Sequence, residues 1–84
     1  MFITVTSITP NNGSKKGGTS VTIAGKDFEP GATVRIGGVA ATNVVVVNPT
    51  TITCVTPAGN GKKDVTVTNL DGRPATLAGG FNFK

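Results

Sequence analysis

Thr19-Ser20-Val21-Thr22-Ile23-Ala24-Gly25 is the stretch that decides the fold, because its side chains alternate between apolar and polar. Val21 and Ile23 are apolar, whereas Ser20 and Thr22 are polar. Successive side chains of a β-strand point to opposite faces, so this alternation indicates a strand with one buried face. No window of the chain has the period of an amphipathic helix. The stretch therefore predicts an all-β protein.

Outward from this stretch, similar alternating runs recur at intervals of about 8–12 residues, separated by residues that favour turns. Turns are predicted at Glu29-Pro30-Gly31, Gly37-Gly38, Asn48-Pro49 and Asp71-Gly72, with a longer one over 11–18. The predicted strands cover residues 2–8, 19–24, 33–36, 39–47, 50–56, 64–70 and 75–83. About seven short strands with such turns are typical of a Greek-key β-sandwich. Residues 1–84 are too few for more than a single domain.

The alternation also predicts the hydrophobic core. Cys54 falls on the same face as Ile52, and with no second cysteine in the chain it cannot form an internal disulfide. We therefore interpret it as a buried thiol that acts as a small apolar side chain. The position of Phe2 is left open. The predicted core consists of Val21, Ile23, Phe28, Ile36, Ile52, Cys54, Val65, Val67, Phe81 and Phe83.

The composition argues against catalysis. The chain has no His, and its acidic residues are Asp27, Glu29, Asp64 and Asp71. Without His, a Ser or Cys nucleophile lacks its usual base, and most of the acids fall in predicted turns rather than in a cleft. Asp27 and Glu29 lie beside one turn, but two carboxylates are too few for a dedicated calcium cage. We expect no enzyme activity, no cofactor and no metal.

Charge and aromatic content limit the partners. The net charge is +4, but the only basic doublets, Lys15-Lys16 and Lys62-Lys63, are placed by the sequence in Gly-rich turns. A nucleic-acid surface needs a basic stripe, ideally with aromatic rings, so no nucleic-acid partner is expected. Without Trp or Tyr, carbohydrate contact is expected only weakly, through polar loops.

Asn12-Gly13-Ser14 matches the glycosylation sequon. Asn in a Gly-rich turn is also explained by its tolerance of left-handed backbone. Whether Asn12 is modified stays open.

Several fragments together resemble the IPT/TIG family. The chain contains Ile8-Thr9-Pro10 with Gly13, then Gly17 to Gly25 with Phe28, and Val34 to Gly38 with Ala41. Thr50 to Cys54 with Pro57-Ala58, Val65 to Asn69 with Asp71-Gly72, and finally Phe81 and Phe83 follow in the family's order. The resemblance covers residues 5–83 and implies an immunoglobulin-like fold of the E-set type. It implies no single function, because the family occurs in bacterial surface proteins, receptor ectodomains, starch-active enzymes and transcription factors.

Val44-Val45-Val46-Val47 is the one surface feature that suggests a partner. Alternation and the family pattern place Val44 and Val46 in the core, so Val45 and Val47 should face outward. With Val39, they form a candidate apolar strip that packs against a neighbouring domain or subunit. Scattered exposed valines are also common without any function.

Three functional hypotheses remain. The leading one is a non-catalytic structural or adhesion module, a spacer or protein–protein interaction domain, in an extracellular or cell-surface protein. Because no signal peptide or transmembrane stretch is visible and Met1 leads almost directly into the first strand, a small virion decoration or tail protein is the second. The third is an accessory glycan-binding module. No membrane insertion is expected.

Overall fold

Nine strands and no helix make up the part of the chain that the computed structural model describes, residues 3–84. The strands are β1 (Thr4–Thr9), β2 (Asn12–Gly13), β3 (Ser20–Lys26), β4 (Thr33–Ile36), β5 (Val39–Ala40), β6 (Thr42–Asn48), β7 (Thr51–Val55), β8 (Gly61–Thr68) and β9 (Pro74–Phe83). No segment of residues 3–84 forms a helix long and apolar enough to cross a membrane.

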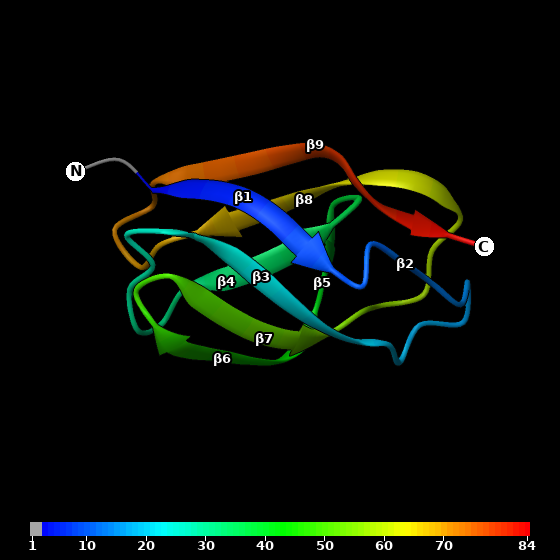
Figure 1. The fold of residues 1–84 in the computed structure, drawn as a ribbon, viewed down its shortest axis with the longest axis horizontal. Helices are drawn as coiled ribbons and strands as arrows, with labels where there is room; N and C mark the ends of the chain where they lie inside the picture. Colours follow the sequence, from blue (N-terminus) through cyan, green and yellow to red (C-terminus); the bar gives the residue numbers. More distant parts are fainter. Residues whose placement is uncertain (1–2) are drawn as a thin grey trace.

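The strands form two sheets that face each other (Figure 1). One has the order β1-β3-β7-β6, and the other has the order β2-β9-β8-β4-β5. Neighbouring strands are antiparallel except for β2 and β9, which are parallel. The molecule is elongated, 34 × 21 × 19 Å, and in Figure 1 β1 begins at one end of the long axis while β9 ends at the other. The predicted β-sandwich is confirmed.

The core lies between the sheets, where the inward side chains of alternating strands meet. The ten side chains named as the predicted core are all buried, and Ile3, Ile8, Ala32 and Val34 join them. The rings of Phe81 and Phe83 pack edge to face, with centroids 4.9 Å apart. Phe2 lies outside the described residues. The prediction that Val44 and Val46 lie in the core is wrong: β6 is an edge strand of its sheet, so both are only half-buried and pack against the core cluster.

The predicted turns form as local backbone preferences require. Gly37 and Gly38 have φ of 63° and 81° and connect the paired residues Ile36 and Val39. Positive φ at both central positions defines the mirror-image turn that suits strand twist. At the Pro-Gly turn, Gly31 has φ of 92°, and the Ala32 amide donates to the Glu29 carbonyl at 3.0 Å. Both turns are as predicted.

The predicted strand 39–47 is wrong as a single element, because the chain changes sheet within it. β5 pairs with β4 in the five-stranded sheet, whereas β6 pairs with β7 in the four-stranded sheet. Ala41, between them, still donates its amide to the Val34 carbonyl at 2.9 Å. Asn43 then takes a left-handed φ of 52°, and the register with β7 shifts there. The change of sheet therefore falls at Ala41, and the kink at Asn43 follows within β6.

The long turn predicted over 11–18 is also partly wrong. Asn12 and Gly13 form β2, which pairs with Asn82 and Phe83. Asn12 is not left-handed, so backbone tolerance does not explain this asparagine; its side-chain amide donates to the Asn11 side chain at 2.9 Å. Gly13 is needed because a Cβ there would overlap the Thr19 hydroxyl and approach the Phe81 ring to 3.0 Å.

Candidate functional site

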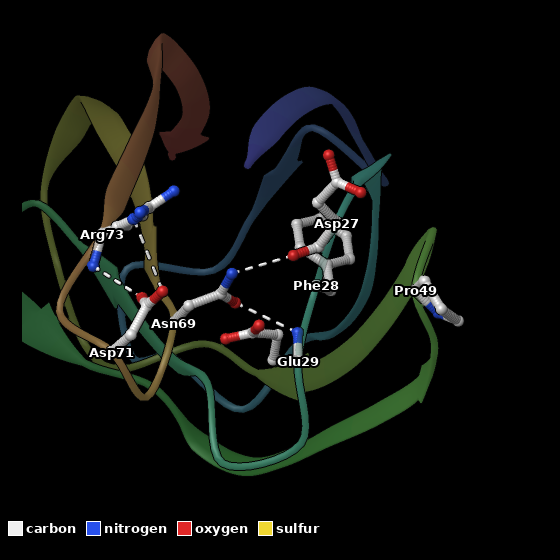
Figure 2. A pocket seen from close by; sticks show the side chains of 7 residues that line it. All are labelled: Asp27, Phe28, Glu29, Pro49, Asn69, Asp71 and Arg73. Carbon is white, nitrogen blue, oxygen red and sulfur yellow. Dashed lines mark hydrogen bonds and ion pairs between the residues drawn. The ribbon is translucent and has the colours of Figure 1, made fainter. Parts of the chain in front are cut away.

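An open groove lies at the end of the sandwich where β8 turns into β9, and it has a volume of about 420 Å³ (Figure 2). The loop between β3 and β4, the β6–β7 turn and the β8–β9 turn meet there. The lining residues are Asp27, Phe28, Glu29, Pro49, Asn69, Asp71 and Arg73.

Asn69 holds this end together. Its side chain is only 6% exposed. Its Oδ1 accepts a hydrogen bond from the Glu29 amide at 3.1 Å, and its Nδ2 donates to the Asp27 carbonyl at 2.8 Å (Figure 2). A carboxamide is suited to this position because it donates and accepts at once. Sequence reasoning did not single out Asn69, since its partners lie 40 and 42 residues away.

The groove does not assemble a catalytic or metal-binding set. Figure 2 shows the Asp27 and Glu29 carboxylates pointing in different directions. Asp71 is paired with Arg73, whose Nε lies 3.5 Å from Asp71 Oδ2, and both side chains are well exposed. Within the described part of the chain, no three His, Cys, Asp or Glu side chains come together as a metal site would require. The groove is therefore best described as a shallow surface hollow.

Cys54 is an inward residue of β7, paired with Val21 of β3, and is buried in the core. Burial raises the pKa of its thiol from the ordinary 9.0 to about 11, because the thiolate would lose its hydration. Since the thiolate is the nucleophilic form, Cys54 is unreactive near neutral pH.

The candidate apolar strip is divided by the structure. Val39, Val45 and Val47 are 51%, 53% and 57% exposed. Val45 and Val47 are outward-facing residues of β6, but Val39 belongs to β5 in the other sheet. The structure therefore brings two of the three valines together. Their role as an interface stays a prediction.

One of the two basic doublets lies in a strand instead of the predicted turn. Lys15 and Lys16 are exposed in the loop before β3, as predicted. Lys62 and Lys63 lie within β8, not in a turn, because β8 begins at Gly61 and pairs with β9 from its first residue. Leu70 is the reverse case: the strand predicted over 64–70 ends at Thr68, so Leu70 is an exposed turn residue, and its side chain lies over Gly31.

Two sheets packed over a common core, with the strand orders given above, define an immunoglobulin-like β-sandwich. The IPT/TIG domain profile matches residues 4–83, so the chain belongs to the IPT/TIG domain family.

This chain spans only a small part of the length of the relatives that it matches. Human fibrocystin-L is 39% identical over 64 residues, which are 75% of this chain and 2% of fibrocystin-L. Among solved structures, the extracellular region of plexin A4 superposes with a TM-score of 0.88 at 26% identity, over all of this chain and 9% of that one. An auxiliary nutrient binding protein from Bacteroides ovatus superposes with a TM-score of 0.78 at 25% identity, over all of this chain and 21% of that one.

Proposed function

We propose that this chain is a non-catalytic module of an extracellular or cell-surface protein, serving as a spacer and protein–protein interaction domain. The observation that carries the proposal is the placement of the first and last strands: β1 begins and β9 ends at opposite ends of the 34 Å axis. A chain that enters at one end and leaves at the other separates whatever is attached to it. The likeness to a domain of the plexin A4 extracellular region supports this assignment.

The chemistry of the side chains supports a non-catalytic role. The chain contains no His, its thiol is buried, and the carboxylates around the groove do not converge on a common point. Partner recognition then has to come from the shape of loops, sheet faces and strand edges.

A distance measurement tests the spacer. Spin labels are attached to a Thr4→Cys, Lys84→Cys double variant. Cys54 stays unlabelled because it is buried in the core, where the reagent does not reach it. We expect one narrow distance distribution near the 34 Å length of the molecule. An unfolded chain of this length would instead give a broad distribution centred at roughly 50 Å. A broad or bimodal distribution under native conditions would contradict the proposal.

An accessory carbohydrate-binding module is the second candidate, and the likeness to the Bacteroides ovatus auxiliary nutrient binding protein favours a ligand-binding role. Titration of the chain against a panel of polysaccharides, followed by NMR chemical shifts, separates the two. Saturable shifts confined to the polar loops would support the second candidate. The virion hypothesis gains nothing from these likenesses, and we do not propose it.

A further inference from the structure

The net charge of this chain resides in four lysines at one end of the molecule. The chain has eight cationic and four acidic side chains, so the acids offset four of the cations. Arg73 is paired with Asp71. Lys26 and Lys63 are each followed directly by an aspartate, and Arg35 and Glu29 complete the balanced set. The cations left over, equal in number to the net charge of +4, are Lys15, Lys16, Lys62 and Lys84. We call these four the lysine cluster.

The fold brings the lysine cluster together from three segments, at the end of the molecule marked C in Figure 1. The Gly59 amide donates to the Lys15 carbonyl at 2.9 Å, which ties the loop before β3 to the loop before β8. The Lys84 amide donates to the Gly13 carbonyl at 2.8 Å, beside β2. Lys62 is the second residue of β8, which starts at this end. Three segments that are distant in the sequence therefore present their lysines on one end of the sandwich.

No acidic side chain offsets the lysine cluster. Residues 11–18, 56–63 and 80–84, which form this end, contain no Asp or Glu. All four lysines are exposed, and within residues 3–84 none of their ammonium groups takes part in a hydrogen bond or an ion pair. Asp64, the first acid beyond these segments, accepts a hydrogen bond from the Gly79 amide at 2.8 Å. Like charges gathered in this way give a positive potential that attracts anions.

The two lysines at the start of β8 point apart, so only one of them belongs to the lysine cluster. Cε of Lys62 lies 3.2 Å from the position that a Cβ on Gly79 of β9 would occupy. Cγ of Lys63 lies 3.0 Å from the corresponding position on Gly37, in the β4–β5 turn. β9 and β4 flank β8 on opposite sides. Lys62 is therefore directed over β9, whereas Lys63 is directed over β4.

Carboxamides lie beside the lysine cluster. Asn12, Asn82 and Lys62 form one row across β2, β9 and β8. Asn82 lies between buried Phe81 and Phe83, so the row faces outward. Neighbouring strands are about 4.8 Å apart, which is close to the length of one sugar unit in a polysaccharide. A carboxamide both donates and accepts hydrogen bonds, and sugar hydroxyls do the same.

We propose that this surface binds an anionic polysaccharide, with the lysine cluster holding its carboxylate or sulfate groups and Asn12 and Asn82 holding its hydroxyls. The inference deepens the carbohydrate-binding candidate above, because it names the site and the charge of the ligand. A nucleic acid is disfavoured, since the aromatic rings at this end, Phe81 and Phe83, are buried and cannot stack with bases. An acidic protein would match the lysines but would leave the carboxamides without hydroxyl partners.

Four lysines on an open surface give weak, salt-dependent binding. We expect a dissociation constant on the order of 0.1 mM at about 0.05 M salt. A polyanion that is bound through lysines releases its condensed counterions. By analogy with single-stranded nucleic acids, the slope of log K against log salt should be about −3 for four contacts.

Titration of the isotope-labelled chain with four polymers, followed by NMR chemical shifts, tests the proposal. Polygalacturonate carries carboxylates, dextran sulfate carries sulfates, and dextran is neutral. Polyglutamate carries carboxylates at a similar spacing but has no hydroxyls. We expect saturable shifts with both anionic polysaccharides, centred on the amides of the lysine cluster, and none with dextran. Polyglutamate should bind at least about threefold more weakly than polygalacturonate, because it offers the carboxamides no hydroxyls.

Lys62→Gln should weaken polygalacturonate binding about three- to fivefold at 0.05 M salt. Lys26→Gln is the matched control, because it removes the same charge beside Thr4, at the opposite end of the 34 Å axis. That separation is about twice the Debye length at this salt, so the control should lose less than about twofold. Asn82→Ala should weaken polygalacturonate binding but leave polyglutamate binding unchanged. Circular dichroism checks folding, and Asn12→Ala replaces Asn82→Ala if that variant is unfolded.

Three results would overturn the proposal: no saturable shift with either anionic polysaccharide, an equal loss for Lys26→Gln and Lys62→Gln, or polyglutamate binding as tight as that of polygalacturonate. Saturable shifts with a neutral polysaccharide that Lys62→Gln leaves unchanged would also overturn this site, yet they would keep the carbohydrate-binding candidate. The label-to-label distance that tests the spacer is measured without any polysaccharide. Failure of the polysaccharide site therefore leaves the spacer function intact.

Discussion

Replacing Asn69 with alanine removes the side chain that joins the β8–β9 turn to the loop before β4. The variant loses the bonds to the Glu29 amide and the Asp27 carbonyl, at 3.1 and 2.8 Å. Each hydrogen bond contributes about 1 kcal/mol net, and partly buried backbone groups left without a partner add to the loss. We expect the free energy of unfolding to fall by about 2–3 kcal/mol. For a domain of this size, that lowers Tm by roughly 8–24 °C.

Asn48→Ala is the matched control for this experiment. Asn48 Oδ1 also accepts two hydrogen bonds, from the Thr50 amide at 2.9 Å and the Thr50 hydroxyl at 2.8 Å. Those bonds are exposed, so water replaces them, and the expected loss is below about 0.5 kcal/mol. The two asparagines differ mainly in burial.

Urea unfolding followed by far-UV circular dichroism measures both variants, because the chain has no Trp or Tyr to report by fluorescence. The midpoint should shift for Asn69→Ala while the slope stays unchanged. If the two variants lie within about 0.5 kcal/mol of each other, burial does not decide the cost and the role assigned to Asn69 is refuted.

Three further predictions concern the core. Burial raises the pKa of the Cys54 thiol to about 11 in the folded state, above its ordinary value of 9.0. The free energy of unfolding should therefore be unchanged below pH 9 and should fall by at most about 2–3 kcal/mol as pH rises from 9 to 11. Urea unfolding at stepped pH measures this fall, which should be smaller for Cys54→Ala. Gly25→Ala should lower the melting temperature more than Gly38→Ala does. The Cβ added at position 25 would lie 2.6 Å from the Phe28 ring, whereas position 38 has open space and only a positive φ. Equal melting temperatures for the two variants would contradict this prediction. Phe81→Ala should lower the free energy of unfolding by about 3–5 kcal/mol, a large share of the roughly 4–12 kcal/mol expected for a domain of 84 residues. Loss of chemical-shift dispersion in the NMR spectrum near body temperature would show that the variant unfolds.

Local patterns were sufficient for most of the strands. The runs 19–24 and 50–56 were recognised from alternation, and β3 and β7 occupy nearly the same residues. The Gly37-Gly38 turn was recognised because two adjacent glycines accept positive φ at little cost. Such features depend on neighbours along the chain and can be read without knowing the rest of the fold.

Features that depend on distant partners were missed or misplaced. Strand 39–47 looked continuous, because nothing in its alternation shows that β5 and β6 pair in different sheets. The sequence predicts a turn at Asn12 and Gly13, because the strand that pairs with them, β9, comes about 70 residues later. For the candidate interface, alternation predicts that Val45 and Val47 face outward, whereas Val39 is added to them because it is near in the sequence and lies in the other sheet.

The sequence by itself determined the class of fold, most of the core side chains and the scarcity of reactive side chains. The alternation of polar and apolar residues, the turn residues and the composition can all be read from short segments. The tertiary structure alone decided that Asn69 closes one end of the sandwich across 40 residues, and that β5 and β6, which follow each other in the chain, pair in different sheets. Strand order and register depend on how the whole core packs, since loop closure and burial are settled between segments far apart in the chain.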